Sequence, residues 1–345
     1  MPAHPDSSPG APSVPAAAGS DLLQVRSLGV QIRSSRETID IVRDVSFDVA
    51  RGEKVAILGE SGSGKTMTGH AIMGILDSPP AFVSSGTVVF GGRDLLTLPD
   101  QERRAVRGKH ISMVFQDSLS ALNPVFSVGF QIAELFRKRG GLRRSEATAR
   151  AAELLDLVEI PNARKRLRDY PHQFSGGMRQ RVMIAMAIAL EPELLIADEP
   201  TTALDVTIQA QIMEMLDRLC DERRMGLILI THDLGLVSEF ADKIVLMYAG
   251  RVVESSSAAA LFTGSAHPYS RALLESVPKL AHRETGLNVI PGAPPDPRDV
   301  GDSCAFAPRC PHAMPACLAG VPPTVEVARG HLSACLIAEE LVARV

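Results

Sequence analysis

Residues 59–66, GESGSGKT, decide the fold of this 345-residue chain. They match the pattern G-x-x-x-x-G-K-[ST], follow the apolar stretch VAIL and precede a helical pattern that extends from residue 64 to 76. In such a loop, glycines let backbone N–H groups surround phosphates, Lys65 reaches the β and γ oxygens, and Thr66 can bind Mg²⁺. We therefore predict a nucleotide site formed by Gly59, Glu60, Ser61, Gly62, Ser63, Gly64, Lys65 and Thr66.

A second apolar stretch, LLIADE (194–199), predicts the acidic part of the same site. Asp198 would end this strand and join the Mg²⁺ shell, and Glu199 would polarise the attacking water. Gln116 follows ISMVF, and His232 follows LILIT. Both would lie at the carboxyl ends of strands, where parallel sheets bind ligands. We expect Gln116 to contact Mg²⁺ or the water, and His232 to hydrogen-bond the γ-phosphate and the water.

Composition and periodicity divide the chain into segments. Residues 1–20 hold five prolines in the first fifteen positions, which predicts a disordered tail. From residue 21 to about 265, short apolar strands alternate with helical patterns, which predicts an α/β fold with a largely parallel sheet. Helical patterns near 128–139 and 145–158, without an obvious strand between them, predict an inserted helical subdomain at about 117–175.

The C-terminal segment, residues 266–345, has a different composition, with nine prolines between positions 291 and 323. Proline removes ladder donors, so we expect a small appendage that does not continue the parallel sheet and is held together by something other than a hydrophobic core. Its cysteines, Cys304, Cys310, Cys317 and Cys335, follow the spacing C-x5-C-x6-C-x17-C.

Disulfides are disfavoured in a reducing cytoplasm, so the four cysteines favour a metal site. Four thiolates suit tetrahedral zinc or an iron–sulfur cluster, and free thiols are the third alternative. His312 or His331 could replace one ligand. Cys220 lies in a helical pattern away from the others, and we expect it in the core.

Charge and hydropathy exclude several classes of protein. The net charge of −4 gives no reason to expect nucleic-acid binding. The longest apolar run, VMIAMAIAL (182–190), is shorter than the roughly 18 to 20 residues of a membrane span. The first residues lack the basic and apolar regions of a secretory signal. We expect a cytoplasmic chain whose membrane role, if any, comes through partners.

Six motifs in order carry a family resemblance: GESGSGKT, Gln116, FSGGM (174–178), LLIADEP, TALD (202–205) and His232. Together they resemble the nucleotide-binding subunit of an ATP-binding-cassette (ABC) transporter, over residues 22–265. The resemblance implies a P-loop NTPase cassette with an antiparallel β portion, whose subunits dimerise head to tail. It further implies that Ser175, Gly176 and Gly177, at a helix N-terminus, close on the partner's ATP, while Asp205 crosses the interface.

Other stretches resemble the dipeptide and oligopeptide (peptide/nickel) importer branch of that family. They are QDSLSALNPVFSVG (116–129), the signature with Met178 where glutamine is usual, AHPYSRALLESVP (266–278) and the cysteine tail. The resemblance implies that Leu122, Asn123 and Pro124 lie in the groove that grips a permease helix. It also implies a 4Fe-4S cluster on the four cysteines.

The branch resemblance implies an ATPase that powers import of di- or oligopeptides, with nickel or another small solute as the alternative substrate. The implied partners are a second cassette subunit, with a heterodimer favoured, two transmembrane permeases and an extracytoplasmic solute-binding protein. The chain would lie at the cytoplasmic face of the membrane. A soluble cassette ATPase acting on nucleic acid or the ribosome is a remote alternative, because the chain has one cassette, no heptad run and an acidic charge.

The chain departs from the family at the adenine site. The family usually stacks adenine on an aromatic residue upstream of the phosphate loop, but residues 21–46 contain none, and Ile32 is the candidate occupant. Stacking contributes about 1–3 kcal/mol in comparable base contacts, so we expect weaker adenine binding or looser base selectivity.

Overall fold

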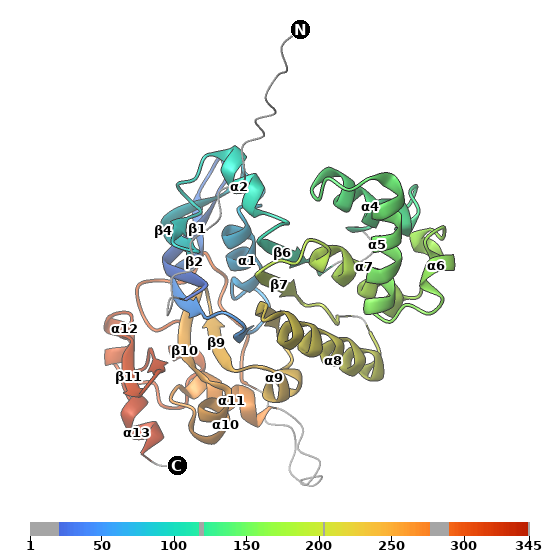
Figure 1. The fold of residues 1–345 in the computed structure, drawn as a ribbon. Coiled ribbons are helices and arrows are strands. Elements are labelled where there is room, and N and C mark those ends of the chain that lie inside the picture. Colours follow the sequence, from blue (N-terminus) through green and yellow to red (C-terminus); the bar gives the residue numbers. More distant parts are fainter. Residues whose placement is uncertain (1–20, 117–120, 203, 277–289, 344–345) are drawn as a thin grey trace.

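Two β-sheets organise the protein, and Figure 1 shows the helices arranged around them. The computed structural model describes residues 21–116, 121–202, 204–276 and 290–343, so the predicted tail, residues 1–20, lies outside the described residues. The larger sheet has the order β11-β12-β10-β9-β3-β8-β7-β6. Its strands are β3 (Lys54–Leu58), β6 (Ile111–Val114), β7 (Leu194–Asp198), β8 (Gly226–Thr231), β9 (Lys243–Tyr248), β10 (Arg251–Ser257), β11 (Val325–Ala328) and β12 (His331–Ser333).

The run β9-β3-β8-β7-β6 is parallel, as the continuous apolar strands predict. The smaller sheet is antiparallel, in the order β2-β1-β4-β5. Its strands are β1 (Leu23–Arg33), β2 (Thr38–Val49), β4 (Ala81–Phe90) and β5 (Arg93–Asp94).

Helix α1 (Lys65–Met73) contacts both sheets, and its Ile72 shares one buried cluster with Val30 of β1 and Ile196 of β7. This packing fixes the start of α1, and with it the phosphate loop. A further helix, α2 (Asp100–Val106), precedes β6.

Helices gather in a lobe to one side of the sheets (Figure 1). They are α4 (Val128–Lys138), α5 (Arg144–Leu157), α6 (Ala163–Arg166), the 3-10 turn η1 (Pro171–Gln173) and α7 (Gly176–Ile188). Val128, Ile132 and Phe136 of α4 recur every four residues and are buried, which is the apolar stripe of an amphipathic helix. Their cluster continues into the parallel sheet. Two helices, α8 (Val206–Arg223) and α9 (Leu234–Phe240), flank β8 in sequence.

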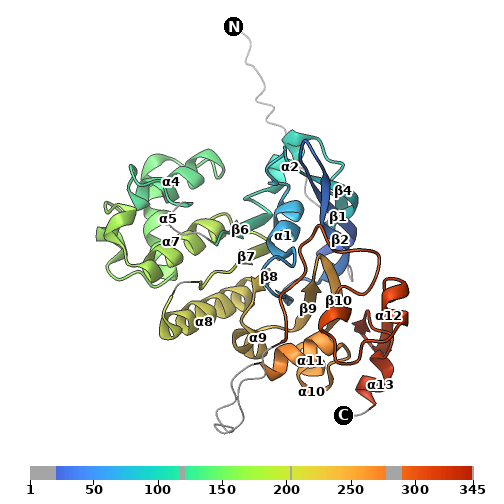
Figure 2. The same ribbon diagram turned by 180° about the vertical axis from the view of Figure 1, so that it is seen from behind.

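The C-terminal segment joins the cassette instead of standing apart from it. Its elements are α11 (Pro268–Glu275), η2 (Ala307–Arg309), α12 (Ala316–Ala319), β11, β12 and α13 (Ala338–Val342). Helix α10 (Ala258–Gly264) precedes it. Strand β12 pairs antiparallel with β10, and β11 with β12, so the segment widens the sheet at its edge. Figure 2 shows α12 and α13 beside β10, α10 and α11.

The prediction that this segment lacks a hydrophobic core was wrong. Phe306 is buried, belongs to the same cluster as the parallel sheet, and lies with its ring centroid 5.3 Å from Tyr248 and 5.4 Å from Tyr269. Prolines suggested a coil, but Pro322 and Pro323 precede β11 and leave the ladder intact. No helix among the described residues is long and apolar enough to cross a bilayer.

Candidate active site and cysteine pocket

The phosphate loop connects β3 to α1, and close backbone packing explains two of its glycines. A Cβ on Gly59 would lie 2.2 Å from the carbonyl oxygen of Met247, which belongs to the neighbouring strand β9. Gly64 caps α1 in a left-handed conformation with φ +96°, and a Cβ there would lie 2.9 Å from the carbonyl oxygen of Ile41. The loop is therefore tightly wrapped and rigidly placed at the helix N-terminus.

The ammonium group of Lys65 lies inside this loop. Its Nζ donates to the carbonyl oxygens of Gly59 at 2.7 Å and Glu60 at 3.0 Å. Burial lowers the pKa of Lys65, and the carboxylates of Glu199, Asp198 and Glu60 oppose that shift. The loop thus holds a cation surrounded by acidic groups, at the place where phosphate oxygens would bind.

Thr66 and Asp198, two of the residues predicted to bind Mg²⁺, contact each other. The Thr66 hydroxyl donates to Oδ1 of Asp198 at 3.2 Å. Burial raises the pKa of Asp198, and the hydrogen bond from Thr66 works against that rise. A hydroxyl and a carboxylate are hard oxygen donors of the kind Mg²⁺ prefers, so the residues fit this ion. Gln116, the third predicted Mg²⁺ ligand, does not contact this pair but donates from its side-chain amide to the carboxylate of Glu199, the next residue after Asp198.

The Glu199 carboxylate is hydrogen-bonded to three polar side chains of the predicted catalytic site. Gln116 Nε2 lies 2.8 Å from Oε2, His232 Nδ1 lies 3.0 Å from Oε1, and the Thr202 hydroxyl donates to Oε2 at 2.9 Å. Burial alone would raise the pKa of Glu199, but the hydrogen bonds from His232 and Thr202 outweigh it and the pKa falls below its usual value. Glu199 also has a left-handed φ of +44°, which is uncommon for this residue type.

Thr202 is a site residue that the sequence analysis did not assign. It belongs to the stretch TALD (202–205), whose Asp205 was singled out, and its position three residues after Glu199 was the available signal. Residue 203 lies outside the described residues.

The predicted signature residues lie at the start of α7. The Ser175 hydroxyl caps this helix by accepting the N–H of Met178 at 3.4 Å. Gly177 packs closely on α8, because a Cβ there would lie 2.7 Å from Cγ2 of Ile208. Ser175, Gly176, Gly177 and Asp205 line one groove of about 510 Å³, which also contacts Arg181. This groove belongs to the helical lobe and α8, away from α1 (Figure 1).

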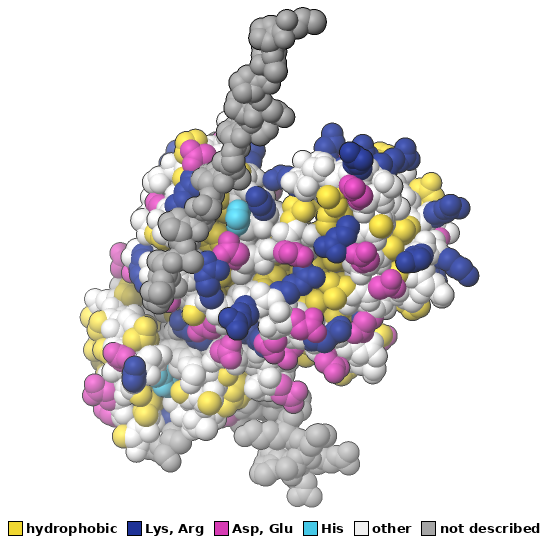
Figure 3. Space-filling view, viewed as in Figure 1, with side chains coloured by type: hydrophobic (Ala, Val, Ile, Leu, Met, Phe, Trp, Pro, Cys, Tyr) yellow, Lys and Arg dark blue, Asp and Glu magenta, His cyan; other side chains and the backbone are white. Residues whose placement is uncertain are grey.

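A second groove, of about 260 Å³, separates the helical lobe from β6. Leu122 is buried in its wall beside Phe115 and Met183. Asn123 is exposed and is held by Gln131, whose amide donates to its carbonyl oxygen at 2.9 Å, and Pro124 is exposed. Figure 3 shows hydrophobic side chains between the helical lobe and the part that holds the sheets, and mixed acidic and basic groups elsewhere on this face. Residues 117–120 lie outside the described residues.

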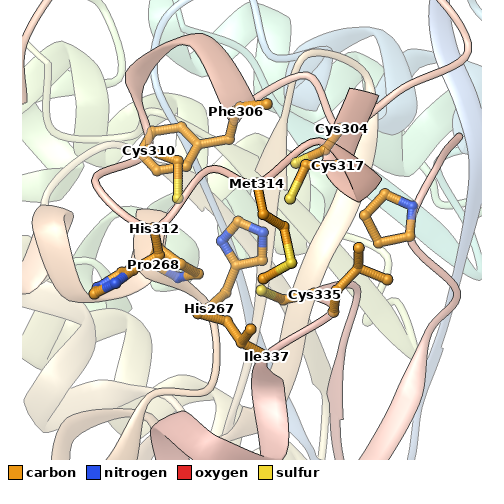
Figure 4. A pocket seen from close by; sticks show the side chains of 13 residues that line it. His267, Pro268, Cys304, Phe306, Cys310, His312, Met314, Cys317, Cys335 and Ile337 are labelled. Atoms are coloured by element: carbon orange, nitrogen blue, oxygen red, sulfur yellow. The ribbon is translucent and has the colours of Figure 1, made fainter. Parts of the chain in front are cut away.

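The four predicted cysteine ligands, Cys304, Cys310, Cys317 and Cys335, line one small cavity of about 20 Å³ (Figure 4). His312 also lines it. His331 does not serve this site, because its Nε2 lies 2.7 Å from Oε1 of Glu254. Cys220 is buried in the main core, as expected.

Backbone amides point toward three of the four sulfur atoms of the cavity. Amides of Phe306 and Ala307 hydrogen-bond Cys304, that of His312 hydrogen-bonds Cys310, and that of Ile337 hydrogen-bonds Cys335. Burial raises the pKa of Cys335 to about 11 and also raises that of Cys304 and Cys310. A bound cation would reverse this by stabilising the thiolates.

The donor set of the cysteine cavity fits a thiolate-bound metal in its chemistry. Four cysteine sulfur atoms are the ligands of tetrahedral zinc and of iron–sulfur sites. The cavity has room for a group the size of one water, so the sulfur atoms would have to move apart around a cluster. Within the described residues, no group of three or more His, Cys, Asp or Glu side chains could hold a metal ion as it stands.

His267 is a further residue of this cavity that the sequence analysis did not assign. It is 2% exposed, and its Nδ1 accepts the N–H of Tyr269 at 3.0 Å. Burial lowers the pKa of His267 to about 3, so the ring is neutral at physiological pH. Figure 4 shows this ring extending between the cysteine side chains.

The fold and the phosphate site define a P-loop nucleotide hydrolase of the ATP-binding-cassette class. The dimeric ATP-binding cassette MJ0796, in a post-hydrolysis state bound to ADP and Pi, is similar over 68% of this chain and 98% of that chain, with a TM-score of 0.61 and 28% identity. The predicted α/β cassette, with its mostly parallel sheet, antiparallel portion and helical insertion, is confirmed.

Sequence comparisons define the family more closely. Residues 42–202 match the family model for the ABC transporter, and residues 253–317 match that for the oligopeptide/dipeptide transporter, C-terminal region. The oligopeptide transport ATP-binding protein OppD of Salmonella typhimurium is 46% identical, over 91% of this chain and 93% of that protein. A putative peptide import ATP-binding protein of Brucella melitensis is 45% identical, over 93% and 98%. The chain therefore belongs to the ATPase subunits of ABC transporters, which confirms the resemblance.

Proposed function

We propose that this chain hydrolyses ATP to power the import of di- or oligopeptides through a membrane ABC transporter. The observation that carries the ATPase part is the convergence of Gln116, Thr202 and His232 on Glu199, beside the Thr66–Asp198 pair. The peptide part is supported by the C-terminal match and by the names of the relatives. Nickel or another small solute is the alternative substrate.

The residues suggest a division of labour in hydrolysis. The loop amides of residues 59–66 and Lys65 would hold the triphosphate, and Thr66, Asp198 and Gln116 would hold Mg²⁺, which supplies charge neutralisation at the β and γ oxygens. Glu199 would orient the attacking water and accept its proton as the new O–P bond forms and the bond to the ADP oxygen breaks. His232, hydrogen-bonded to Glu199, would hold that water and the γ-phosphate in line.

We further propose that two cassettes enclose ATP between them. Ser175, Gly176 and Gly177 of one subunit would bind the γ-phosphate held by the other, with Asp205 at the interface, so that hydrolysis would loosen the pair. A heterodimer of similar cassettes, two permeases and an extracytoplasmic binding protein would complete the transporter at the cytoplasmic face of the membrane. In this proposal residues 21–265 form the cassette, with its helical subdomain at about 117–175, and residues 266–345 form the extension.

The apolar groove around Leu122 would receive a cytoplasmic helix of a permease, with Asn123 and Pro124 at its rim. The buried position of Leu122 in the wall of the groove between the helical lobe and β6 supports this role. Motion of the helical lobe relative to the sheets would then be transmitted to the permease.

Glu199→Gln in the assembled transporter tests the ATPase proposal. The variant should bind ATP but lose turnover, since an amide cannot accept the proton. Glu193→Gln is the matched control, because Glu193 accepts hydrogen bonds from Arg51 and His110 near the start of β7, the strand that ends just before Glu199. Unchanged turnover in Glu199→Gln would place the active site elsewhere. Uptake of labelled peptide into vesicles, competed by excess peptide or by nickel, tests the substrate.

We propose that Cys304, Cys310, Cys317 and Cys335 bind a 4Fe-4S cluster, with zinc as the alternative. Their shared cavity and the amides that point toward three of the sulfur atoms support a thiolate-bound metal. An ultraviolet–visible spectrum of anaerobically purified protein, with iron, sulfide and zinc assays, separates the alternatives. Broad brown absorbance with about four irons per chain is expected. A colourless protein with zinc would favour the alternative, and one without metal would mean free thiols.

A further inference from the structure

Glu60, the second residue of the phosphate loop, forms an ion pair with Arg309, a residue far away in the sequence. Arg309 donates from Nη1 to Oε2 of Glu60 at 2.7 Å and from Nη2 to Oε1 at 3.1 Å. This is a bidentate ion pair, the strong geometry for arginine and carboxylate. The side chain of Arg309 is 7% exposed and that of Glu60 is 21% exposed, so water screens the pair poorly.

Arg309 is itself held by the C-terminal extension. It ends the turn η2 and directly precedes Cys310, and its Nε donates to the carbonyl oxygen of Pro291 at 2.8 Å. Its Nη1 also contacts the hydroxyl of Tyr248 at 3.1 Å. The extension reaches the same loop residue a second time, because the Glu60 N–H donates to the hydroxyl of Tyr269 at 3.0 Å.

The charge of Glu60 lies where it matters for phosphate binding. Its carboxylate is among the groups that act on the pKa of Lys65, the cation of the loop. A free carboxylate at this place would repel a bound triphosphate, and the repulsion would be strong because the surroundings are partly dry. A cation opposite the Glu60 carboxylate removes that repulsion. Among the described ion pairs, the cation that meets this carboxylate is Arg309, whereas Lys65 contacts only the carbonyl oxygen of Glu60.

We propose that Arg309 is a positioning residue for nucleotide binding: it neutralises the Glu60 carboxylate and holds it away from the phosphates, which makes the affinity of the loop dependent on the cysteine-bearing segment. The inference rests on the proposed function, namely that this loop binds ATP. Because Arg309 adjoins Cys310, a displacement of the cysteine cavity is transmitted to the phosphate loop. By linkage, nucleotide binding in turn acts on that segment.

A double-mutant cycle on the full chain tests this role. The dissociation constant of MgATP is measured at low salt for the wild type, Arg309→Gln, Glu60→Gln and the double variant. Arg309→Gln should bind about tenfold more weakly, equivalent to about 1.4 kcal/mol. The double variant should regain most of that loss, because an amide has replaced the repelling carboxylate. Glu60→Gln alone should shift affinity in the opposite direction from Arg309→Gln.

Arg271→Gln is the matched control. Arg271 links α11 to the residue before the extension and to α13, through the carbonyl oxygens of Ser265 and Leu341, but contacts neither Glu60 nor the loop in the described hydrogen bonds. Its MgATP affinity should stay within about twofold of the wild type, a change of less than 0.5 kcal/mol by the usual conversion.

Two outcomes would overturn the inference. If the double variant binds as weakly as Arg309→Gln, then Arg309 acts through the fold of the extension and not through the charge of Glu60. If Arg309→Gln does not fold, Glu60→Gln decides, and weaker binding by that variant contradicts the repulsion. A wild-type protein that binds no ATP would instead refute the proposed function.

Discussion

Glu254 of the cassette has a fully buried carboxylate that contacts the C-terminal extension, and these contacts support a quantitative prediction. Its side chain is fully buried in β10. It accepts the N–H of Ala266 at 2.6 Å, the N–H of His267 at 3.0 Å and the hydroxyl of Ser270. The fourth contact is Nε2 of His331, at 2.7 Å. One carboxylate thus joins β10, the start of α11 and β12.

We expect Glu254→Gln to cost about 1–3 kcal/mol of stability, the range for one buried hydrogen-bonding group left unsatisfied. Glutamine has nearly the same shape, so packing is preserved. Its amide, however, replaces one acceptor oxygen with a donor. The contacts are two per oxygen, with Ala266 and His331 on Oε1 and His267 and Ser270 on Oε2. In either orientation of the amide one backbone donor, the N–H of Ala266 or that of His267, therefore loses its acceptor, at about 1–3 kcal/mol. The Ser270 hydroxyl and the His331 ring can instead turn to accept from the amide.

The assay is denaturant unfolding of the full chain, followed by far-ultraviolet circular dichroism. Glu326→Gln is the matched control, since Glu326 is an exposed carboxylate of the same extension that accepts the N–H of Gly330 at 2.8 Å. The control should change stability by about 0.5 kcal/mol or less. If Glu254→Gln loses no more stability than this control, the four contacts do not hold the extension to the cassette as described.

Three further predictions concern single side chains. Thr202→Val removes a donor from Glu199, so its pKa should rise and the acidic limb of the ATPase pH profile should move to higher pH; an unmoved limb would contradict the hydrogen bond. Burial raises the pKa of Cys220 to about 12, so mass spectrometry should find it alkylated after unfolding and unmodified in the native protein; rapid native alkylation would exclude the buried position. Ile32→Phe should tighten ATP binding by about 1–3 kcal/mol and increase the preference for ATP over GTP, which the wild type should bind with similar affinity; strong ATP preference in the wild type would show that another group selects the base.

The sequence was sufficient for features that depend on neighbours in the chain. The phosphate loop needs glycines at fixed places between a strand and a helix, so its pattern is visible within residues 59–66. Asp198 and Glu199 follow a run of apolar residues, and a parallel sheet aligns the carboxyl ends of its strands. Those two facts place both acidic residues near the loop without knowledge of any long-range contact.

The same reasoning could not find the partners of Glu60 and Glu254. Arg309 lies 249 positions from Glu60, and His331 lies 77 positions from Glu254. Single arginines and histidines in a proline-rich stretch resemble surface residues, because a pattern of one sequence reveals which face of an element is apolar but not which element covers it. Strands β11 and β12, with four and three residues, are also too short for a periodic signal.

These distant contacts change how the C-terminal extension is understood. Without it, Glu60 would lose both Arg309 and Tyr269, strand β10 would become an open edge, and Tyr248 would lose the ring of Phe306. Each loss falls on the cassette and not on the extension, and the first falls on the phosphate loop itself. The extension is therefore part of the structure that shapes the nucleotide site, and the cysteine cavity lies one residue from that contact, at Cys310.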